Sequence, residues 1–421
     1  DIIWVHDYQL LLCPKMIRDQ KPNITIGFFL HIPFPSFEIF RIFPWREELL
    51  KGILGADQIG FHTYDYVRHF LSSVKRILKY DVDFNRIDLG SRKVVVDTFP
   101  MGIDFEKFNF AAKKRLSEKG KSKSELKKQL EYHKKTSVGG KLILSIDRLD
   151  YTKGVINRIK AFEIFLKKYP QYLEKVRLVM LTVPSRAEVS DYKNLKRETD
   201  EIVGRVNGEF ATVNWTPIWY YYRNMDFEDL VDLYTTSDIA MITPVRDGMN
   251  LVAKEFVSTR VDKDGVLILS EMAGASKELF QSILVNPFDL NNMAEALFQA
   301  VNMTKNEQIE RNKRMQIRLK RYNVRHWAKE FMRGLEQQSK IKVKSTATKI
   351  DNIQLSKIKA NFDSATKKIF FLDYDGTLVE FNDKPKLAVP SSRVKKVLEE
   401  ISGLKNTEVV IISGRDQSFL S

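Results

Sequence analysis

The 421-residue sequence is poor in cysteine, and its one copy, Cys13, has no partner for an intramolecular disulfide. Such usage is typical of a reducing compartment, so we expect a cytoplasmic protein. Long apolar runs are also lacking: no stretch is long enough to cross a bilayer, and no secretory signal is recognisable. The sequence therefore predicts no membrane partner. We interpret Cys13 as a small buried apolar side chain.

Acidic residues are fewer than basic ones, with 54 Asp and Glu against 69 Lys and Arg and a net charge of +15. A surplus of this size can indicate nucleic-acid binding. Much of it, however, lies in 107–135 and 311–344, where few aromatic side chains are interleaved to stack on bases. We interpret these segments as solvated helix faces and linkers, and we expect no nucleic-acid partner.

What the sequence does contain is the material of a large globular protein. Hydrophobic residues make up 43% of the chain, and its length suits roughly two to three domains. Short apolar runs alternate with amphipathic stretches, which predicts an α/β fold with parallel sheets. The strand candidates are Ile2–Val5, Ile24–Leu30, Gln58–Phe61, Val94–Thr98, Leu142–Ile146, Val176–Thr182, Ile239–Ile242 and Val266–Leu269.

The most informative stretch is Arg246–Glu255, which follows an apolar, strand-like segment and precedes a helical pattern. Its Asp-Gly-Met-Asn loop lies where a strand gives way to a helix N-terminus, and free N–H groups there favour a phosphate or diphosphate. Asp247 and Glu255 are about two helical turns apart. The two carboxylates could address two ends of an extended ligand such as a nucleotide sugar. An ordinary surface loop with capping residues is the alternative.

A second segment supports the ligand interpretation. The strand candidate at 142–146 is followed by the loop Asp147-Arg-Leu-Asp-Tyr-Thr-Lys-Gly and then by a helical pattern from Val155 to Tyr169. Arg148 and Lys153 belong to this loop, where two fixed cations could neutralise the charge on a departing diphosphate. A solvated salt bridge is the alternative.

Three further motifs lie near the start: one begins at His6 (His-Asp-Tyr), one at His31 (His-Ile-Pro-Phe-Pro) and one at Gly60 (Gly-Phe-His-Thr). With the two loops above, they resemble the trehalose-6-phosphate synthases in order and rough spacing over roughly residues 1 to 335. That family comprises retaining glycosyltransferases of GT-B fold, in which two Rossmann-like domains face a cleft. Five motifs in the right order make a chance match implausible.

The resemblance implies UDP-glucose as the donor and glucose 6-phosphate as the acceptor, with trehalose 6-phosphate and UDP as the products. It implies that Arg148 and Lys153 hold the donor diphosphate, and that Glu255 accepts the ribose hydroxyls. The residues expected along the nucleotide are Leu251, Val252, Ala253, Lys254 and Glu255. Those expected at the glucosyl hydroxyls and diphosphate are Asp247, Gly248, Met249 and Asn250.

On the acceptor side, the resemblance implies that His31 lies beside the transferred glucose, that Asp7 binds acceptor hydroxyls, and that Arg186 binds the acceptor phosphate. A packed histidine and a surface arginine are the structural alternatives. No protein nucleophile is assigned, since the leaving diphosphate could itself take the acceptor proton. No cofactor is expected for the transferase. The pairs Asp81/Asp83 and Asp262/Asp264 are interpreted as turn residues rather than metal ligands.

The last part of the chain carries different motifs. Strand candidates at 368–372 and 409–412 are followed by Asp373-Tyr-Asp-Gly-Thr-Leu and Ser413-Gly-Arg-Asp. These resemble haloacid-dehalogenase (HAD) phosphatases of the trehalose-6-phosphate phosphatase type. The resemblance implies that Asp373 attacks phosphorus, that Asp375 is the general acid/base, that both hold Mg²⁺, and that Ser413 holds a phosphate oxygen. The lysine and second acidic motif of that superfamily are absent, so no hydrolysis is expected.

We therefore predict an α/β protein of two Rossmann-like parallel-sheet domains, the first incomplete, followed by a partial HAD-like domain. The boundaries expected are 1–104 for the acceptor-side domain, 105–334 for the nucleotide-sugar domain, 335–362 for a linker and 363–421 for the phosphatase-like domain. The chain is interpreted as truncated at both ends. A glucosylglycerol-phosphate synthase and an inactive, regulatory sugar-phosphate-binding relative are the alternatives, and a homo-oligomer is compatible with the sequence.

Overall fold

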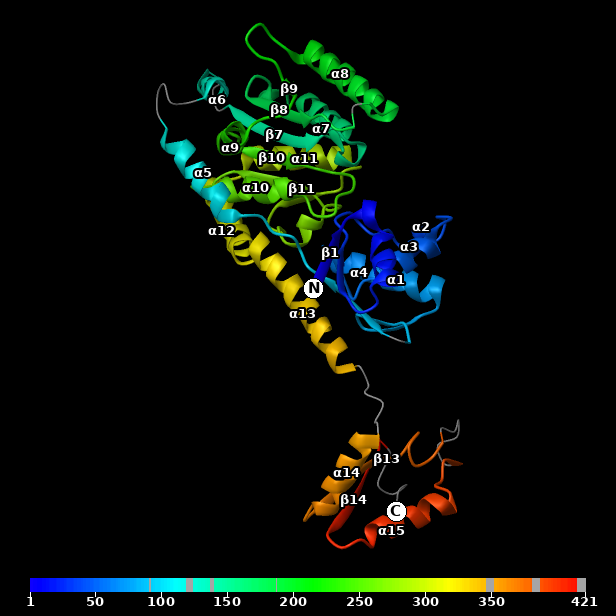
Figure 1. The fold of residues 1–421 in the computed structure, drawn as a ribbon. Coiled ribbons are helices and arrows are strands. Elements are labelled where there is room, and N and C mark those ends of the chain that lie inside the picture. The colour runs from blue at the N-terminus through cyan, green and yellow to red at the C-terminus, as the bar shows by residue number, and fades with distance from the viewer. Residues whose placement is uncertain are drawn as a thin grey trace. The chain divides into compact units, whose positions relative to one another are not determined.

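The computed structural model describes residues 1–90, 92–118, 124–136, 140–186, 188–345, 352–380 and 387–414. Lys119, Lys121 and Lys123 of the basic segment 107–135, and Arg415 and Asp416 of the motif that begins at Ser413, fall outside these ranges. The chain divides into two compact units, residues 1–342 and 343–421, and Figure 1 shows their elements. No helix in the described ranges is both long and apolar enough to cross a membrane.

The first sheet of the larger unit has the strand order β1-β2-β3-β6-β5-β4. The strands β1, β2, β3 and β6 are parallel, whereas β4 and β5 form an antiparallel hairpin at one edge. Asp81 and Asp83 belong to this hairpin, so their interpretation as turn residues was wrong. The strands are β1 (Ile2–His6), β2 (Thr25–Phe29), β3 (Gln58–Phe61), β4 (Asp81–Asp83), β5 (Arg86–Asp88) and β6 (Lys93–Thr98).

Helices follow these strands, as expected for βα units. They are η1 (Tyr8–Leu10), α1 (Cys13–Gln20), α2 (Phe37–Phe40), α3 (Arg46–Ile53), α4 (Tyr64–Ser73) and the π-helical turn η2 (Val74–Leu78). A continuous core lies between the sheet and these helices, and it includes the fully buried Phe28 and Phe61. Cys13 is partly buried against this core.

The second sheet is entirely parallel, in the order β12-β11-β10-β7-β8-β9. Its inner strands read as almost unbroken apolar runs because helices cover both faces. The strands are β7 (Lys141–Arg148), β8 (Val176–Val183), β9 (Ile218–Tyr222), β10 (Ile239–Ile242), β11 (Val266–Ser270) and β12 (Ile283–Val285).

Two groups of helices enclose this second sheet (Figure 1). One face is covered by α7 (Val155–Lys168), α8 (Ser190–Phe210) and α11 (Leu290–Asn302). The other is covered by α5 (Phe105–Ser117), α6 (Glu125–Thr136), α9 (Phe227–Thr236), α10 (Leu251–Thr259) and α12 (Lys305–Arg321). The short turns are η4 (Tyr151–Lys153), η5 (Pro170–Tyr172) and η6 (Gly274–Lys277).

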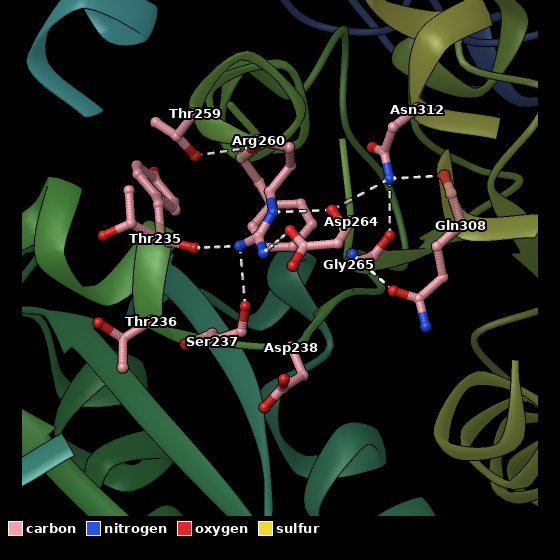
Figure 2. A network of polar contacts seen from close by, with 12 residues as sticks. Thr235, Thr236, Ser237, Asp238, Thr259, Arg260, Asp264, Gly265, Gln308 and Asn312 are labelled. Atoms are coloured by element: carbon pink, nitrogen blue, oxygen red, sulfur yellow. Dashed lines mark hydrogen bonds and ion pairs between the residues drawn. The ribbon is translucent and has the colours of Figure 1, made fainter. Parts of the chain in front are cut away.

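The turn that follows α10 joins α9, α10 and α12 through Arg260 and Asn312 (Figure 2). The buried Arg260 donates to the carbonyls of Tyr234 and Ser237 at the end of α9, at 2.7 and 2.8 Å. It also donates to the Asp264 carboxylate at 2.7 Å. Asn312 of α12 donates to the Gly265 carbonyl at 2.7 Å. The ends of α9 and α10 are thereby held in one arrangement.

The long helix α13 (Val324–Ser345) returns to the first sheet. Its Phe331 is fully buried against Phe29 of β2. A Cβ atom on Gly27 or Gly60 would lie 2.7 or 2.8 Å from the Phe331 ring. The helix therefore packs directly against the bare backbone of these two glycines. Gln58 also donates to the Phe331 carbonyl at 2.8 Å.

The smaller unit contains two parallel strands, β13 (Lys368–Asp373) and β14 (Thr407–Ile412). Its helices are α14 (Asn352–Ser364) and α15 (Ser392–Ser402). Tyr374, Val379 and Ala388 form a small core. The segment 335–362, interpreted from its sequence as a linker, contains the second half of α13 and most of α14, so much of it is helical.

Candidate functional site

The loop before α10 is shaped by an asparagine in an unusual conformation. Asn250 has a positive φ of 74°, and its side chain accepts the N–H of Ala253 at 3.0 Å, which caps the helix. The N–H groups of Leu251 and Val252 in the first turn have no intrahelical acceptor. This end of α10 therefore has the donors that an anionic ligand requires.

Asp247 links this loop to the neighbouring one. Its Oδ2 accepts from Lys153 Nζ at 2.6 Å and from Asn250 Nδ2 at 3.0 Å. The two loops are adjacent because β7 and β10 pair directly. Gly154 allows the close approach: its φ is +66°, and a Cβ atom there would lie 2.4 Å from the Thr243 carbonyl. The structure thus brings together three of the residues predicted for donor binding, Lys153, Asp247 and Asn250.

Arg148 is the last residue of β7 and is exposed. Lys254 differs: its side chain is fully buried, its Nζ donates to the Met101 carbonyl at 2.7 Å, and it forms an ion pair with Glu278. Burial lowers the pKa of Lys254, and the Glu278 carboxylate opposes that shift. The ammonium of Lys254 is therefore engaged inside the protein, and a contact of this residue with a nucleotide would have to come from its backbone.

Glu255 is half-buried on α10, one turn beyond the helix start. The hydroxyl of the fully buried Tyr234 donates to its Oε2 at 2.7 Å. Burial raises the pKa of Glu255, whereas the Tyr234 hydroxyl and the charge of Lys107 lower it. The sequence motif indicated Glu255 but not Tyr234, because 21 residues and a strand separate the two.

The first domain contributes the loop after β2. A Cβ atom on Gly248 would lie 1.8 Å from the His31 carbonyl oxygen, so this loop touches the Asp247–Asn250 loop of the second domain. Asp7 has a φ of 71°, and its Oδ1 accepts the His31 N–H at 3.3 Å. His6 Nδ1 and His31 Nε2 are 3.1 Å apart, which is hydrogen-bonding distance when one of them carries a proton.

Burial is the main cause of a lowered pKa at three neighbouring histidines, His6, His31 and His62. The His31 and His62 ring centroids are 5.4 Å apart. At neutral pH these imidazoles are therefore uncharged, so the three histidines offer polar groups to a ligand but no positive charge. His62 lies within a motif that the sequence singled out, but its closeness to His31 was not predicted.

The side chain of Arg186 joins the second domain to the first. Its guanidinium donates to the Tyr8 hydroxyl at 2.6 Å and to the Tyr192 hydroxyl at 3.1 Å. Tyr192 in turn donates to Asp150 at 3.0 Å. Arg186 thus lies beside Tyr8, the neighbour of Asp7, as expected if both serve one ligand. Tyr192 was missed because nothing in its local sequence distinguishes it from a core tyrosine.

In the smaller unit, the two predicted phosphatase motifs meet at the carboxyl ends of β13 and β14. Asp373 pairs in register with Ile412, and the Tyr374 N–H donates to the Ile412 carbonyl at 3.2 Å. Asp373 is therefore the last residue of β13, and Asp375 and Ser413 come just after the ends of β13 and β14. In the described part of the chain, no three His, Cys, Asp or Glu side chains form a metal-binding group.

Comparison with known proteins places this geometry in a family. Residues 1–337 match the family model of Glycosyltransferase family 20, and residues 371–421 match that of Trehalose-phosphatase. A Thermoproteus tenax protein described as a bifunctional trehalose-6-phosphate synthase/phosphatase is 42% identical over 426 residues. The match covers 100% of this chain and 57% of that protein, so the chain spans little more than half its length.

Solved structures agree. An α,α-trehalose-phosphate synthase (UDP-forming) from Burkholderia xenovorans, in complex with glucose-6-phosphate, matches with a TM-score of 0.74 and 36% identity, covering 80% of this chain and 74% of that one. A structure from E. coli bound with UDP-2-fluoro glucose matches with a TM-score of 0.75 and 34% identity, covering 80% and 73%. With two parallel-sheet domains in the GT-B arrangement and a family match over residues 1–337, the chain belongs to glycosyltransferase family 20.

Proposed function

We propose that the whole protein transfers glucose from UDP-glucose to glucose 6-phosphate with retention, giving trehalose 6-phosphate and UDP. One observation carries the proposal: the Lys153–Asp247–Asn250 cluster of the second domain touches the His31 loop of the first through Gly248. A donor held at the start of α10 would thus face groups of the other domain. The relatives bound to glucose-6-phosphate and to UDP-2-fluoro glucose support these substrates.

In this proposal, Arg148 and Lys153 neutralise the diphosphate as the glucosyl bond breaks. Before the donor binds, Asp247 holds Lys153 in place. Once the donor is bound, Asp247 accepts hydrogen bonds from hydroxyls of the glucosyl group. Neutral His31 offers a hydrogen bond beside the sugar, while Asp7 and Arg186 take the hydroxyls and the phosphate of the acceptor. The leaving diphosphate receives the acceptor proton on the same face, so no protein nucleophile is needed.

We also propose a separate role for each domain of the chain. Residues 1–104 provide the acceptor side and 105–334 the nucleotide-sugar side, while 335–362 connect them to a phosphatase-like domain at 363–421. The cytoplasm is the proposed location, because a single cysteine suits a reducing compartment.

For the phosphatase-like domain, we propose a phosphate site at Asp373, Asp375 and Ser413. Two carboxylates that follow a strand end suit Mg²⁺, which proteins commonly hold through one or two carboxylates together with substrate phosphate. Asp373 and Asp375 would hold the ion, which when bound would supply charge neutralisation at the phosphate. Asp375 would exchange a proton with the leaving group, and Ser413 would donate a hydrogen bond to a phosphate oxygen.

The test is UDP release by the full-length protein, supplied with UDP-glucose and with glucose 6-phosphate, glycerol 3-phosphate or no acceptor. Release should require glucose 6-phosphate and fall at least about 100-fold in Arg148→Ala, since a charge contact made in the transition state is lost. Arg197→Ala, an exposed arginine on α8, is the matched control. UDP release with glycerol 3-phosphate but not with glucose 6-phosphate would mean that the acceptor is glycerol 3-phosphate. Binding of UDP-glucose without UDP release under any condition would contradict the proposal.

A further inference from the structure

The carboxylate of Glu255 is held by a single side-chain donor in the described part of the chain, the Tyr234 hydroxyl at 2.7 Å. That hydrogen bond engages Oε2. The other oxygen, Oε1, has no hydrogen-bond partner among the described residues. It is also not closed off from solvent, so a ligand can reach it. The carboxylate is therefore turned so that one oxygen is fixed in the protein and the other is open.

The Tyr234 hydroxyl is itself fixed in space. The side chain is fully buried in the core between β7, β10 and the helices α9 and α10. Its carbonyl accepts from Arg260 at 2.7 Å, and Arg260 is held by Asp264, as Figure 2 shows for the arginine and its partners. A donor locked in this way holds the carboxylate in one rotamer at little further entropic cost.

We propose that Tyr234 is a positioning residue for nucleotide recognition, which holds Glu255 so that Oε1 meets the ribose hydroxyls. The inference rests on the proposed function, because it assumes that a nucleotide occupies the start of α10. Tyr234 touches no ligand itself. It acts by keeping a partly buried carboxylate both ionised and aimed, since a hydrogen bond to a charged acceptor is stronger than one between neutral groups.

Loss of the hydroxyl would have two effects on Glu255. The carboxylate would gain rotamer freedom, and burial would favour its protonated form more strongly, which weakens it as an acceptor for two ribose hydroxyls. Both effects act on binding and neither acts on the bond that breaks. Tyr234→Phe should therefore raise KM for UDP-glucose about tenfold, the equivalent of about 1.4 kcal/mol, with little change in kcat.

The decisive measurement compares the affinities of UDP and 2′,3′-dideoxyuridine diphosphate, which lacks the ribose hydroxyls, by calorimetry on the full-length protein. The wild-type protein should prefer UDP. Tyr234→Phe should lose most of that preference while binding the dideoxy compound as before, and Glu255→Gln should behave similarly. Tyr169→Phe is the matched control, because it removes a 2.6 Å hydrogen bond from a tyrosine to Glu295 far from α10.

The possible outcomes separate the two proposals. A wild-type protein that binds neither diphosphate would overturn the proposed function, whereas one that binds both equally would overturn the ribose role of Glu255, and with it the inference. A wild-type preference that survives in Tyr234→Phe would overturn the positioning role alone. A thermal melt checks that the variant folds. If Tyr234→Phe does not fold, Tyr234→Met takes its place, because methionine fills the ring space without a hydroxyl. Loss of the preference for UDP in that variant would support the positioning role, and an unchanged preference would overturn it.

Discussion

At the scale of single residues, Gly248 shows how little space separates the two halves of the site. Its backbone has no positive φ, so sterics alone demand glycine: a Cβ atom would lie 1.8 Å from the His31 carbonyl oxygen. Gly248→Ala must push the loops apart or distort one of them. We expect a loss of about 1–3 kcal/mol in the free energy of unfolding, measured by urea denaturation, together with loss of UDP release.

Gly204 is the matched control for this prediction. It lies inside α8, and a Cβ atom there would have nothing within 4 Å. Gly204→Ala should therefore stabilise the protein by about 0.5–1 kcal/mol and leave UDP release unchanged. Equal behaviour of the two variants would show that the contact between Gly248 and the His31 loop is not needed.

The residues of the site were predictable only where the chain itself places them side by side. Asp247 and Asn250 share a loop, so their contact follows from the motif. The pairing of Lys153 with Asp247 depends on β7 lying next to β10, which local sequence does not specify. The same limit explains why the buried ammonium of Lys254 was not foreseen, since its partner Glu278 comes 24 residues later.

At the scale of elements, α7 and α8 are clamped by a charge cluster whose strength should depend on pH. Glu163 accepts two hydrogen bonds from Arg205, at 2.8 and 2.6 Å, and one from Lys167 at 2.7 Å. The Arg205 hydrogen bonds are the main reason that the pKa of Glu163 falls from 4.5 to about 2. The clamp therefore stabilises the folded state fully above pH 4.5 and is lost as pH falls toward 2.

Glu163→Gln should consequently lower the urea midpoint at pH 6 but much less at pH 3, where the wild-type carboxylate has already lost part of its advantage. The exposed Glu188, whose nearest cation is Lys193 at 3.5 Å, provides the control Glu188→Gln. That variant should differ little from the wild type at either pH. An equal loss at both pH values in Glu163→Gln would mean that packing, and not charge, holds the two helices.

Elements with a strong apolar pattern were predicted well, and weak ones were not. All eight strand candidates of the larger unit are strands, because each is a short, mainly apolar run, whereas β9 and β12 were not among the candidates. The hairpin β4–β5 was missed, since its strands have three residues each and carry Asp at most exposed positions. The helix over 335–345 was missed as well, because its second half is polar and lacks a clear period.

At the scale of the whole molecule, the two compact units predict separable activities. Asp373 belongs to residues 343–421, whereas the residues proposed for the donor and the acceptor all lie in 1–342. Asp373→Asn in the full-length protein should therefore abolish any release of phosphate from trehalose 6-phosphate and leave UDP release within about twofold of the wild type. A parallel fall in UDP release would show that the units are coupled.

The return of α13 to the first sheet has a consequence for synthesis on the ribosome. The surface formed by Phe29 and the bare backbone of Gly27 and Gly60 is covered by Phe331, about 270 to 300 residues further along the chain. At about 5–20 residues per second, the nascent chain would wait roughly 15 to 60 s before that cover is made. During this interval an apolar patch lies open to chaperones and to neighbouring chains, so the first sheet is completed only after α13 has been synthesised.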